Sequence, residues 1–228
     1  MIGIIGAMEI EIETLKALMK IEKKEKISGI EYVCGELCGK NAVLAVCGPG
    51  KVNAAACAEA MILKFNPQLI INTGVGGTLS NELKIGDIAV SSAVVEHDMD
   101  TSALGEPKGL IPGINMIEMK ADKESVLKME KALEEVGINY RVGVVASGDQ
   151  FINSSEKKKF ITEEFGGICC EMEGASIGHV CVLNEMPFIV LRAISDGADE
   201  NSHMNYPEFC ALAAENTAKV MQEFLKSV

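Results

Sequence analysis

Short apolar segments alternate with amphipathic segments along the chain, and this alternation limits the fold more than any other feature. Residues 2–6, IGIIG, have the composition of a buried strand, and residues 9–20 then follow a helical period. The same pattern predicts strands at 30–37, 41–48, 68–74, 87–98, 140–148, 188–195 and from 168 onward, and helices at 51–65, 122–136, 154–164, 174–184 and 206–226. Such alternation is typical of a largely parallel sheet with helices on both faces. We therefore predict one α/β domain over residues 1–228.

Composition and charge exclude several classes of protein. The 228 residues are 48% hydrophobic, which indicates a compact folded chain. A formal net charge of −12 argues against binding to nucleic acid or to an anionic membrane surface. The segment 1–13 lacks basic residues and is interrupted by glutamates, so it does not resemble an export signal. We expect a cytoplasmic protein.

The eight cysteines are scattered through apolar segments, which is typical of reduced thiols in a cytoplasmic protein. Cys34 and Cys38 have the spacing of half a zinc site, but no second pair accompanies them. The sequence 96–100, EHDMD, is a weaker candidate for a site binding a hard cation. We therefore expect neither a metal nor a cofactor.

Polar or glycine-rich groups follow five of the predicted strands, at the ends where ligands bind in sheets of this class. Each group has a structural alternative: acids favour the first turn of a helix, glycines form tight turns, and an aspartate can cap a helix. Their occurrence at five strand ends is more informative than any one of them. The groups are Gly6-Ala7-Met8 with Glu9, Glu11 and Glu13; a glycine-rich turn at 73–77; Ser147-Gly148-Asp149 with Phe151; Glu171-Met172-Glu173; and Arg192, Ser195 and Asp196.

The pair Glu171 and Glu173 lies in an otherwise apolar stretch, ICCEMEGASIGHV. If the strand persists to residue 173, its period of two places both acids on one face. Two buried carboxylates repel each other unless each has a hydrogen-bond donor or a cation. The two adjacent hydroxyl groups of a ribose are suitable donors, and Arg192 is a suitable cation.

Six motifs, taken in order, resemble those of the bacterial 5′-methylthioadenosine/S-adenosylhomocysteine nucleosidases, members of the purine nucleoside phosphorylase superfamily. The motifs are GIIGAMEIEIE, CGPGKVNAA, INTGVGGT, SGDQFIN, CEMEGASIGHV and VLRAISDGAD. The resemblance implies a three-layer α/β/α sandwich with a mixed central sheet. It also implies hydrolysis of the N-glycosidic bond of 5′-methylthioadenosine, S-adenosylhomocysteine and 5′-deoxyadenosine, in methionine salvage and nucleoside catabolism, without a cofactor.

The resemblance assigns the chemistry of this reaction to three acids. Asp196, oriented by Ser195, would protonate N7 of the departing purine; it must be a neutral acid at physiological pH, and burial favours that form. Glu11 would hold and deprotonate the attacking water. Glu173 would bind the ribose hydroxyls, with Glu171 supporting it.

The remaining substrate contacts follow from the same resemblance. Phe151 would stack on adenine, and the backbone of Ile152 would contact the edge of that base. Met172 would pack against the sugar, while Met8 and Tyr206 would line the sugar and 5′-thio region. Val75 and Gly76 would lie on the purine side, and Arg192 would help to fix Glu171 and Glu173.

Residues 99–120 form a long segment with little periodicity, and loops of this length in compact domains are usually functional. The resemblance implies a homodimer in which residues near 99–114, including Leu104 and Pro112, complete the neighbour's pocket. Leu104 stands where relatives often have an aromatic residue, and Val75-Gly76 departs from the common turn sequence. These departures predict a wider 5′-pocket and altered contacts on the purine side.

Four alternatives are weighed against the sequence. A phosphorylase would need arginines early in the chain to bind phosphate, but the first arginine is Arg141. An aminodeoxyfutalosine nucleosidase is not separated by these motifs. A nucleoside sensor without catalysis should lack Glu11 or Asp196, and both are present. A nicotinamide oxidoreductase is disfavoured because the G-x-G-x-x-G fingerprint does not follow the first strand.

Overall fold

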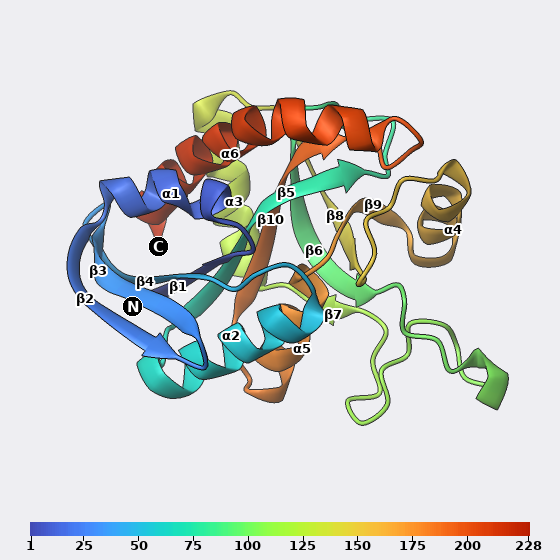
Figure 1. The fold of residues 1–228 in the computed structure, drawn as a ribbon, viewed down its shortest axis with the longest axis horizontal. Coiled ribbons are helices and arrows are strands. Elements are labelled where there is room, and N and C mark those ends of the chain that lie inside the picture. The colour runs from blue at the N-terminus through green and yellow to red at the C-terminus, as the bar shows by residue number, and fades with distance from the viewer.

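A mixed sheet of ten strands forms the centre of the molecule, in the order β10-β6-β8-β9-β5-β1-β4-β3-β2, with β7 beside β6 (Figure 1). This computed structural model describes residues 1–228, except for the side chains of residues 204, 205, 207 and 208. The strands are β1 (Ile2–Gly6), β2 (Lys20–Ile27), β3 (Ile30–Leu37), β4 (Lys40–Val46), β5 (Leu69–Thr78), β6 (Ile88–Glu96), β7 (Met119–Lys120), β8 (Tyr140–Ser147), β9 (Gly167–Glu171) and β10 (Phe188–Asp196).

Helices cover both faces of the sheet, which confirms the predicted α/β/α fold class. In Figure 1, α1, α3 and α6 lie on one face and α2 and α5 on the other, while α4 packs near β8 and β9. None of the helices described is long and apolar enough to cross a membrane. The helices are α1 (Glu9–Leu18), α2 (Lys51–Phe65), α3 (Lys123–Val136), α4 (Ser155–Phe165), α5 (Gly174–Leu183) and α6 (Ser202–Ser227), with a short 3-10 helix η1 (Ser102–Leu104).

Five strands of the sheet close into a ring. Strand β10 pairs with β6 on one side and with β5 on the other, and β9 joins β8 to β5. At the top of the ring, Gly77 of β5 lies opposite Cys170 of β9 and pairs with Asp196 of β10. The carboxyl ends of these three strands therefore meet at one point. The candidate site lies where these three strand ends meet.

The expectation of a largely parallel sheet is wrong. The pairs β1–β4, β1–β5, β10–β5, β6–β8 and β8–β9 are parallel. The pairs β10–β6, β2–β3, β3–β4, β5–β9 and β6–β7 are antiparallel. The alternation of strands and helices does not reveal β5–β9 or β10–β6, because ring closure brings strands together that are distant in the chain.

Strand β2 was not predicted, and its sequence explains why. Its residues KIEKKEKI are mostly exposed, since β2 is the edge strand beyond β3. An edge strand without a buried face lacks the apolar alternation by which a strand is predicted, and its charges discourage pairing with another chain. Helix α1 consequently ends at Leu18, two residues before the predicted boundary.

Three other predicted boundaries are also wrong. The glycine-rich segment 73–77 is not a turn, because β5 continues through it to Thr78. Strand β9 ends at Glu171, so Glu173 does not continue its face and instead caps α5. Helix α6 begins at Ser202, four residues before the predicted start.

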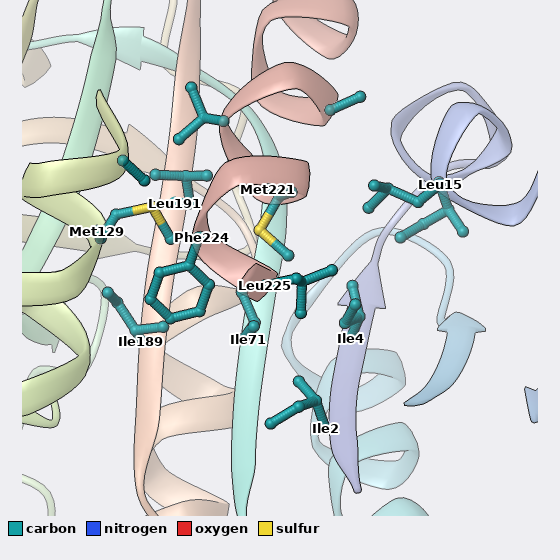
Figure 2. Close-up of a cluster of buried hydrophobic side chains, with 14 of the residues drawn as sticks. Ile2, Ile4, Leu15, Ile71, Met129, Ile189, Leu191, Met221, Phe224 and Leu225 are labelled. Atoms are coloured by element: carbon teal, nitrogen blue, oxygen red, sulfur yellow. The ribbon is translucent and has the colours of Figure 1, made fainter. Parts of the chain in front are cut away.

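Buried apolar side chains fill both sides of the sheet. One cluster joins α1, α3 and α6 to β1, β5 and β10, as Figure 2 shows around Phe224, Met221 and Leu225. A second cluster lies between the sheet and helices α2 and α5. Because the strands are covered on both faces, β10 and β5 are buried along their whole length.

Replacing Leu225 by alanine tests how much the first cluster contributes to stability. Leu225 is fully buried on α6, whereas Leu212 on the same helix is 46% exposed. Leu225→Ala should lower the free energy of unfolding by about 2–5 kcal/mol, through lost burial and the cavity left behind. Leu212→Ala is the matched control and should cost less than about 1 kcal/mol. Urea unfolding of both variants measures the difference, and equal costs would contradict this assignment of the core.

Candidate active site

A cavity of about 630 Å³, partly open to solvent, lies where the ends of β5, β9 and β10 meet. Its wall is mostly apolar with a few carboxyl groups, as is common for sites that bind small molecules. The lining residues are Ala7, Met8, Glu11, Pro49, Val75, Gly76, Gly77, Gln150, Phe151, Ile152, Cys170, Glu171, Met172, Glu173, Ser195, Asp196 and Tyr206.

Three backbone N–H groups fix the carboxylate of Glu11. Ala7 and Met8 donate to Oε2 at 2.7 and 2.9 Å, and Val75 donates to Oε1 at 3.0 Å. Glu11 is the third residue of α1, so its side chain reaches back over the turn that follows β1. The side chain is buried at the cavity wall with both oxygens already oriented. A carboxylate held in this way is suited to binding and polarising a water molecule.

Gly74 makes this arrangement possible. A Cβ at this position would overlap both the Glu11 carboxylate and the Arg192 guanidinium. Strand β5 therefore passes between the two charged groups only because it carries no side chain there. The glycine serves close packing within a strand rather than a turn.

The guanidinium of Arg192 lies fully buried behind the cavity. Its Nη2 donates to Glu171, to the side-chain oxygen of Asn72, and to Oε2 of Glu173 at 3.4 Å. Glu171 also accepts hydrogen bonds from the Ser147 hydroxyl and from the N–H of Glu173 at 3.0 Å. The donors that the buried acid pair requires are therefore present, as the sequence predicts. Glu171 is held by protein groups on both oxygens.

Glu173 has more freedom toward the cavity than Glu171. Its Oε1 accepts a hydrogen bond from the N–H of Gly50 at 2.9 Å, and Oε2 meets Arg192 at the longer distance. Burial raises the pKa of Glu173 to about 7, with Arg192 acting against the rise and Glu171 adding to it. The group consequently changes charge near neutral pH at the wall of the cavity.

Asp196 is the last residue of β10 and pairs with Gly77 of β5. Its Oδ2 accepts a hydrogen bond from the Ser195 hydroxyl at 2.9 Å, and Oδ1 accepts one from the N–H of Ala198 at 2.9 Å. The side chain is 2% exposed, and this remaining surface lines the cavity. The Ser195 hydroxyl and the Ala198 N–H thus hold one oxygen each of the Asp196 carboxyl group.

Aromatic and sulfur-containing side chains form the outer wall. The rings of Phe151 and Tyr206 meet edge to face with their centroids 5.7 Å apart. The hydroxyl of Tyr206 donates to Sδ of Met8 at 3.1 Å, which connects α6 to the turn after β1. Phe151 is 44% exposed and lines the cavity.

The structure brings together all but three of the site residues named from the sequence. Arg192 lies directly behind the wall, and the exposed Leu104 and Pro112 lie far along the loop between β6 and β7. Ala7 and Gly77 line the cavity and belong to groups recognised at strand ends, whereas the lining residues Pro49, Gln150 and Cys170 were not singled out from the sequence. Sequence reasoning also missed the supporting groups Gly50, Asn72 and Ser147 as hydrogen-bond partners of the acids. Pro49 and Gly50 lie within a recognised motif, GPGK, but the apolar context of Asn72 gives no signal.

Comparison with known proteins defines the class to which this fold and site belong. A family model described as the Phosphorylase superfamily matches residues 1–226. A 5′-methylthioadenosine/S-adenosylhomocysteine nucleosidase of Oceanobacillus iheyensis is 36% identical over 228 residues, covering 100% of this chain and 99% of the relative. The nucleosidase of the same name from Neisseria meningitidis, solved with methylthio-immucillin-A, superposes with a TM-score of 0.96 at 37% identity, covering 100% and 99% of the two chains.

A futalosine hydrolase of Helicobacter pylori is also similar, with a TM-score of 0.95 and 35% identity over 100% of this chain and 97% of that chain. The matches extend over the whole chain and include the strands that form the ring. The chain therefore belongs to the 5′-methylthioadenosine/S-adenosylhomocysteine nucleosidase family of the phosphorylase superfamily.

The raised pKa of Glu173 predicts a specific pH dependence of stability. In the folded protein the proton is bound up to about pH 7, whereas an unfolded glutamate loses it near 4.5. The stability that this raised pKa contributes to the folded protein is therefore complete below about pH 4.5, the pKa of glutamate in the unfolded chain. It is lost as the pH rises through about 7, the pKa in the folded protein. Relative to Glu173→Gln, the wild type should gain stability when the pH falls from about 8 to about 5.

Urea unfolding at both pH values measures this difference. Glu164→Gln, at an exposed position on α4, is the control and should follow the wild type at each pH. A constant difference between the wild type and Glu173→Gln across this range would contradict the assignment.

Proposed function

We propose that this protein hydrolyses the N-glycosidic bond of 5′-methylthioadenosine and S-adenosylhomocysteine, and also of 5′-deoxyadenosine, releasing adenine. The observation that carries the proposal is that Glu11, Glu173 and Asp196 line one cavity, each held by fixed hydrogen bonds. Relatives named for this activity match the chain from end to end, which supports the choice of substrate. The product sugars are the matching 5-substituted riboses.

The reaction separates charge, and the acids of the site act on both sides of it. As the C1′–N9 bond breaks, positive charge develops on the sugar and negative charge on the purine. Asp196 gives its proton to N7, so adenine leaves without a negative charge. Glu11 takes a proton from water as the water oxygen bonds to C1′. Glu173 accepts hydrogen bonds from the ribose hydroxyls, while Phe151 stacks on the base and Met172 packs against the sugar.

Water rather than phosphate is the proposed nucleophile. None of the lining residues described is a lysine or an arginine. The nearest guanidinium, Arg192, is already bound to Glu171 and Glu173. A phosphate placed near C1′ would instead meet the carboxylates of Glu11 and Glu173. Like charges repel strongly in a buried site. This arrangement favours hydrolysis over phosphorolysis.

Adenine release from 5′-methylthioadenosine, in phosphate-free buffer and with added phosphate, tests the proposal. Equal rates and free methylthioribose are expected. Asp196→Asn should lower kcat by about 10²–10⁴-fold while the protein still binds the nucleoside, because only proton transfer is lost. Glu11→Gln should act similarly through the water. A phosphate requirement would indicate a phosphorylase. Cleavage of aminodeoxyfutalosine alone would indicate an aminodeoxyfutalosine nucleosidase, the second candidate function, which the similarity to a futalosine hydrolase favours.

The protein is further proposed to act as a homodimer in which residues 99–114 complete the neighbour's pocket. A shallow depression on the face of α2 and α5 has an apolar rim that includes Val52 and Leu183, which are 79% and 63% exposed. The lining residues are Lys51, Val52, Ala55, Glu96, Ser176, His179, Val180 and Leu183. Leu104 on the loop after β6 is 83% exposed. Apolar surface of this kind on helices of a folded domain is typical of an interface.

Sedimentation velocity of charged variants tests the dimer. Val52→Glu and Leu183→Glu together should produce monomers, since each places a charge in the proposed interface. Leu127→Glu, at a 51% exposed position on α3 of the opposite face, is the matched control and should leave the dimer intact. Leu104→Glu should raise KM for the nucleoside without changing the oligomeric state. A monomeric wild type would contradict the proposal.

A further inference from the structure

Lys51, the first residue of α2, lies at a junction of three segments that surround the cavity. Its Nζ donates to Oε2 of Glu96 at 2.9 Å and to Oδ1 of Asp98 at 2.7 Å. Its backbone N–H donates to Oδ1 of Asp149 at 2.8 Å. The N–H of Asp149 in turn donates to Oδ2 of Asp98 at 2.9 Å, so Lys51, Asp98 and Asp149 close a ring of hydrogen bonds.

These ion pairs are shielded from solvent. The side chains of Lys51, Glu96 and Asp98 are 18%, 7% and 15% exposed. Exposed pairs contribute little because water and salt screen them, whereas a shielded pair that loses one partner leaves a charge without compensation. Lys51, Glu96 and Asp98 are therefore buried enough for their ion pairs to act as a clamp between the three segments. His179 adds a contact of 3.2 Å to the second oxygen of Glu96.

Each segment in the junction carries part of the nucleoside site. Gly50, immediately before Lys51, donates its N–H to Glu173. Asp149 lies two residues before Phe151, in the segment proposed to stack on the purine. Asp98 follows β6 and begins the loop proposed to reach a neighbouring subunit. Lys51 thus connects the two sides of the proposed site through its backbone, which adjoins Gly50 and bonds Asp149, and through its ammonium group, which bonds Glu96 and Asp98.

We propose that Lys51 is a positioning residue for nucleoside hydrolysis: its pairs with Glu96 and Asp98 hold the Gly50 N–H against Glu173 and hold the 148–152 segment over the purine. Lys51 does not line the cavity, so it acts through these neighbours rather than on the substrate. The inference rests on the proposed function, because positioning is defined relative to a bound nucleoside. It adds a group that the six motifs contain but that no step of the hydrolysis uses.

The position of the Gly50 N–H affects the charge of Glu173. This hydrogen bond favours the ionised carboxylate and lowers its pKa, as does Arg192, whereas burial, Glu171 and Glu11 raise it. Loss of the Gly50 contact should therefore move the ionisation of Glu173 to higher pH. The groups that face Glu173 are Arg192 of β10, Glu171 of β9, Glu11 of α1, Cys47 before α2 and Tyr206 of α6.

The first test replaces Lys51 by methionine, which keeps the length of the side chain and removes the charge. At neutral pH, kcat/KM for 5′-methylthioadenosine should fall about tenfold, mainly through KM, and its acidic limb should move upward by about one pH unit. Lys64→Met is the matched control, because Lys64 lies on the same helix in an exposed pair with Glu25 at 3.4 Å. Its pH profile should match that of the wild type.

A second variant separates positioning from a direct electrostatic effect. Asp98→Asn opens the same clamp, yet it removes a negative charge where Lys51→Met removes a positive one. If Lys51 acts by position, both variants move the acidic limb upward. If it acts only as a distant charge, Asp98→Asn moves the limb downward and the proposal is overturned.

The outcomes also separate this inference from the proposed function. An active wild type with unchanged KM and pH profile in both variants overturns the positioning role and leaves the activity intact. Absence of adenine release from the wild type overturns the proposed function and this inference with it. Should Lys51→Met not fold, Asp98→Asn carries the test, and Lys51→Arg, which retains the charge, should keep the wild-type pH profile.

Discussion

The buried guanidinium of Arg192 is the interaction on which the rest of the site depends. It pairs with Glu171 and Glu173 and holds the side chain of Asn72, whose amide donates to the carbonyl of Ile5 in β1 at 2.9 Å. The strands β1, β5, β9 and β10 are thereby linked through one cation. Because buried charges are tolerated only when paired, the ring of strands and the acid cluster require each other.

One cation among three acids leaves the cavity negative, and this imbalance agrees with the proposed chemistry. A sugar that gains positive charge during bond cleavage is stabilised by fixed carboxylates that need no reorganisation. Glu11, whose oxygens are held by three backbone N–H groups, cannot turn away from the cavity. The proposed mechanism places the departing purine near Asp196, whose carboxyl group accepts a hydrogen bond from Ser195. The two ends of the bond thus meet groups suited to opposite charges.

The sequence predicts those parts of the structure that local patterns determine. The buried strand at 2–6 and the helix at 51–65 agree with β1 and α2, and each of the five groups at strand ends contributes at least one residue to the candidate site. Strand β2 escaped prediction because an edge strand needs no apolar face. Asn72 and the hydrogen bond from Gly50 to Glu173 could not be predicted, since they join residues far apart in the chain through ring closure. The position of β9 opposite β5 depends on the same long-range geometry.

The glycines of β5 restrict how this site can change during evolution. A Cβ at residue 76 would come within 2.7 Å of the Cys169 sulfur, and one at residue 77 within 2.8 Å of an Asp196 oxygen. A side chain at either position would therefore require the neighbouring strands to move apart. Substitutions are less restricted at the outer wall of the cavity, where Met8 precedes α1 and Tyr206 lies near the start of α6. During evolution the preference of this site for the 5′-substituent can thus change more readily than its preference for the base.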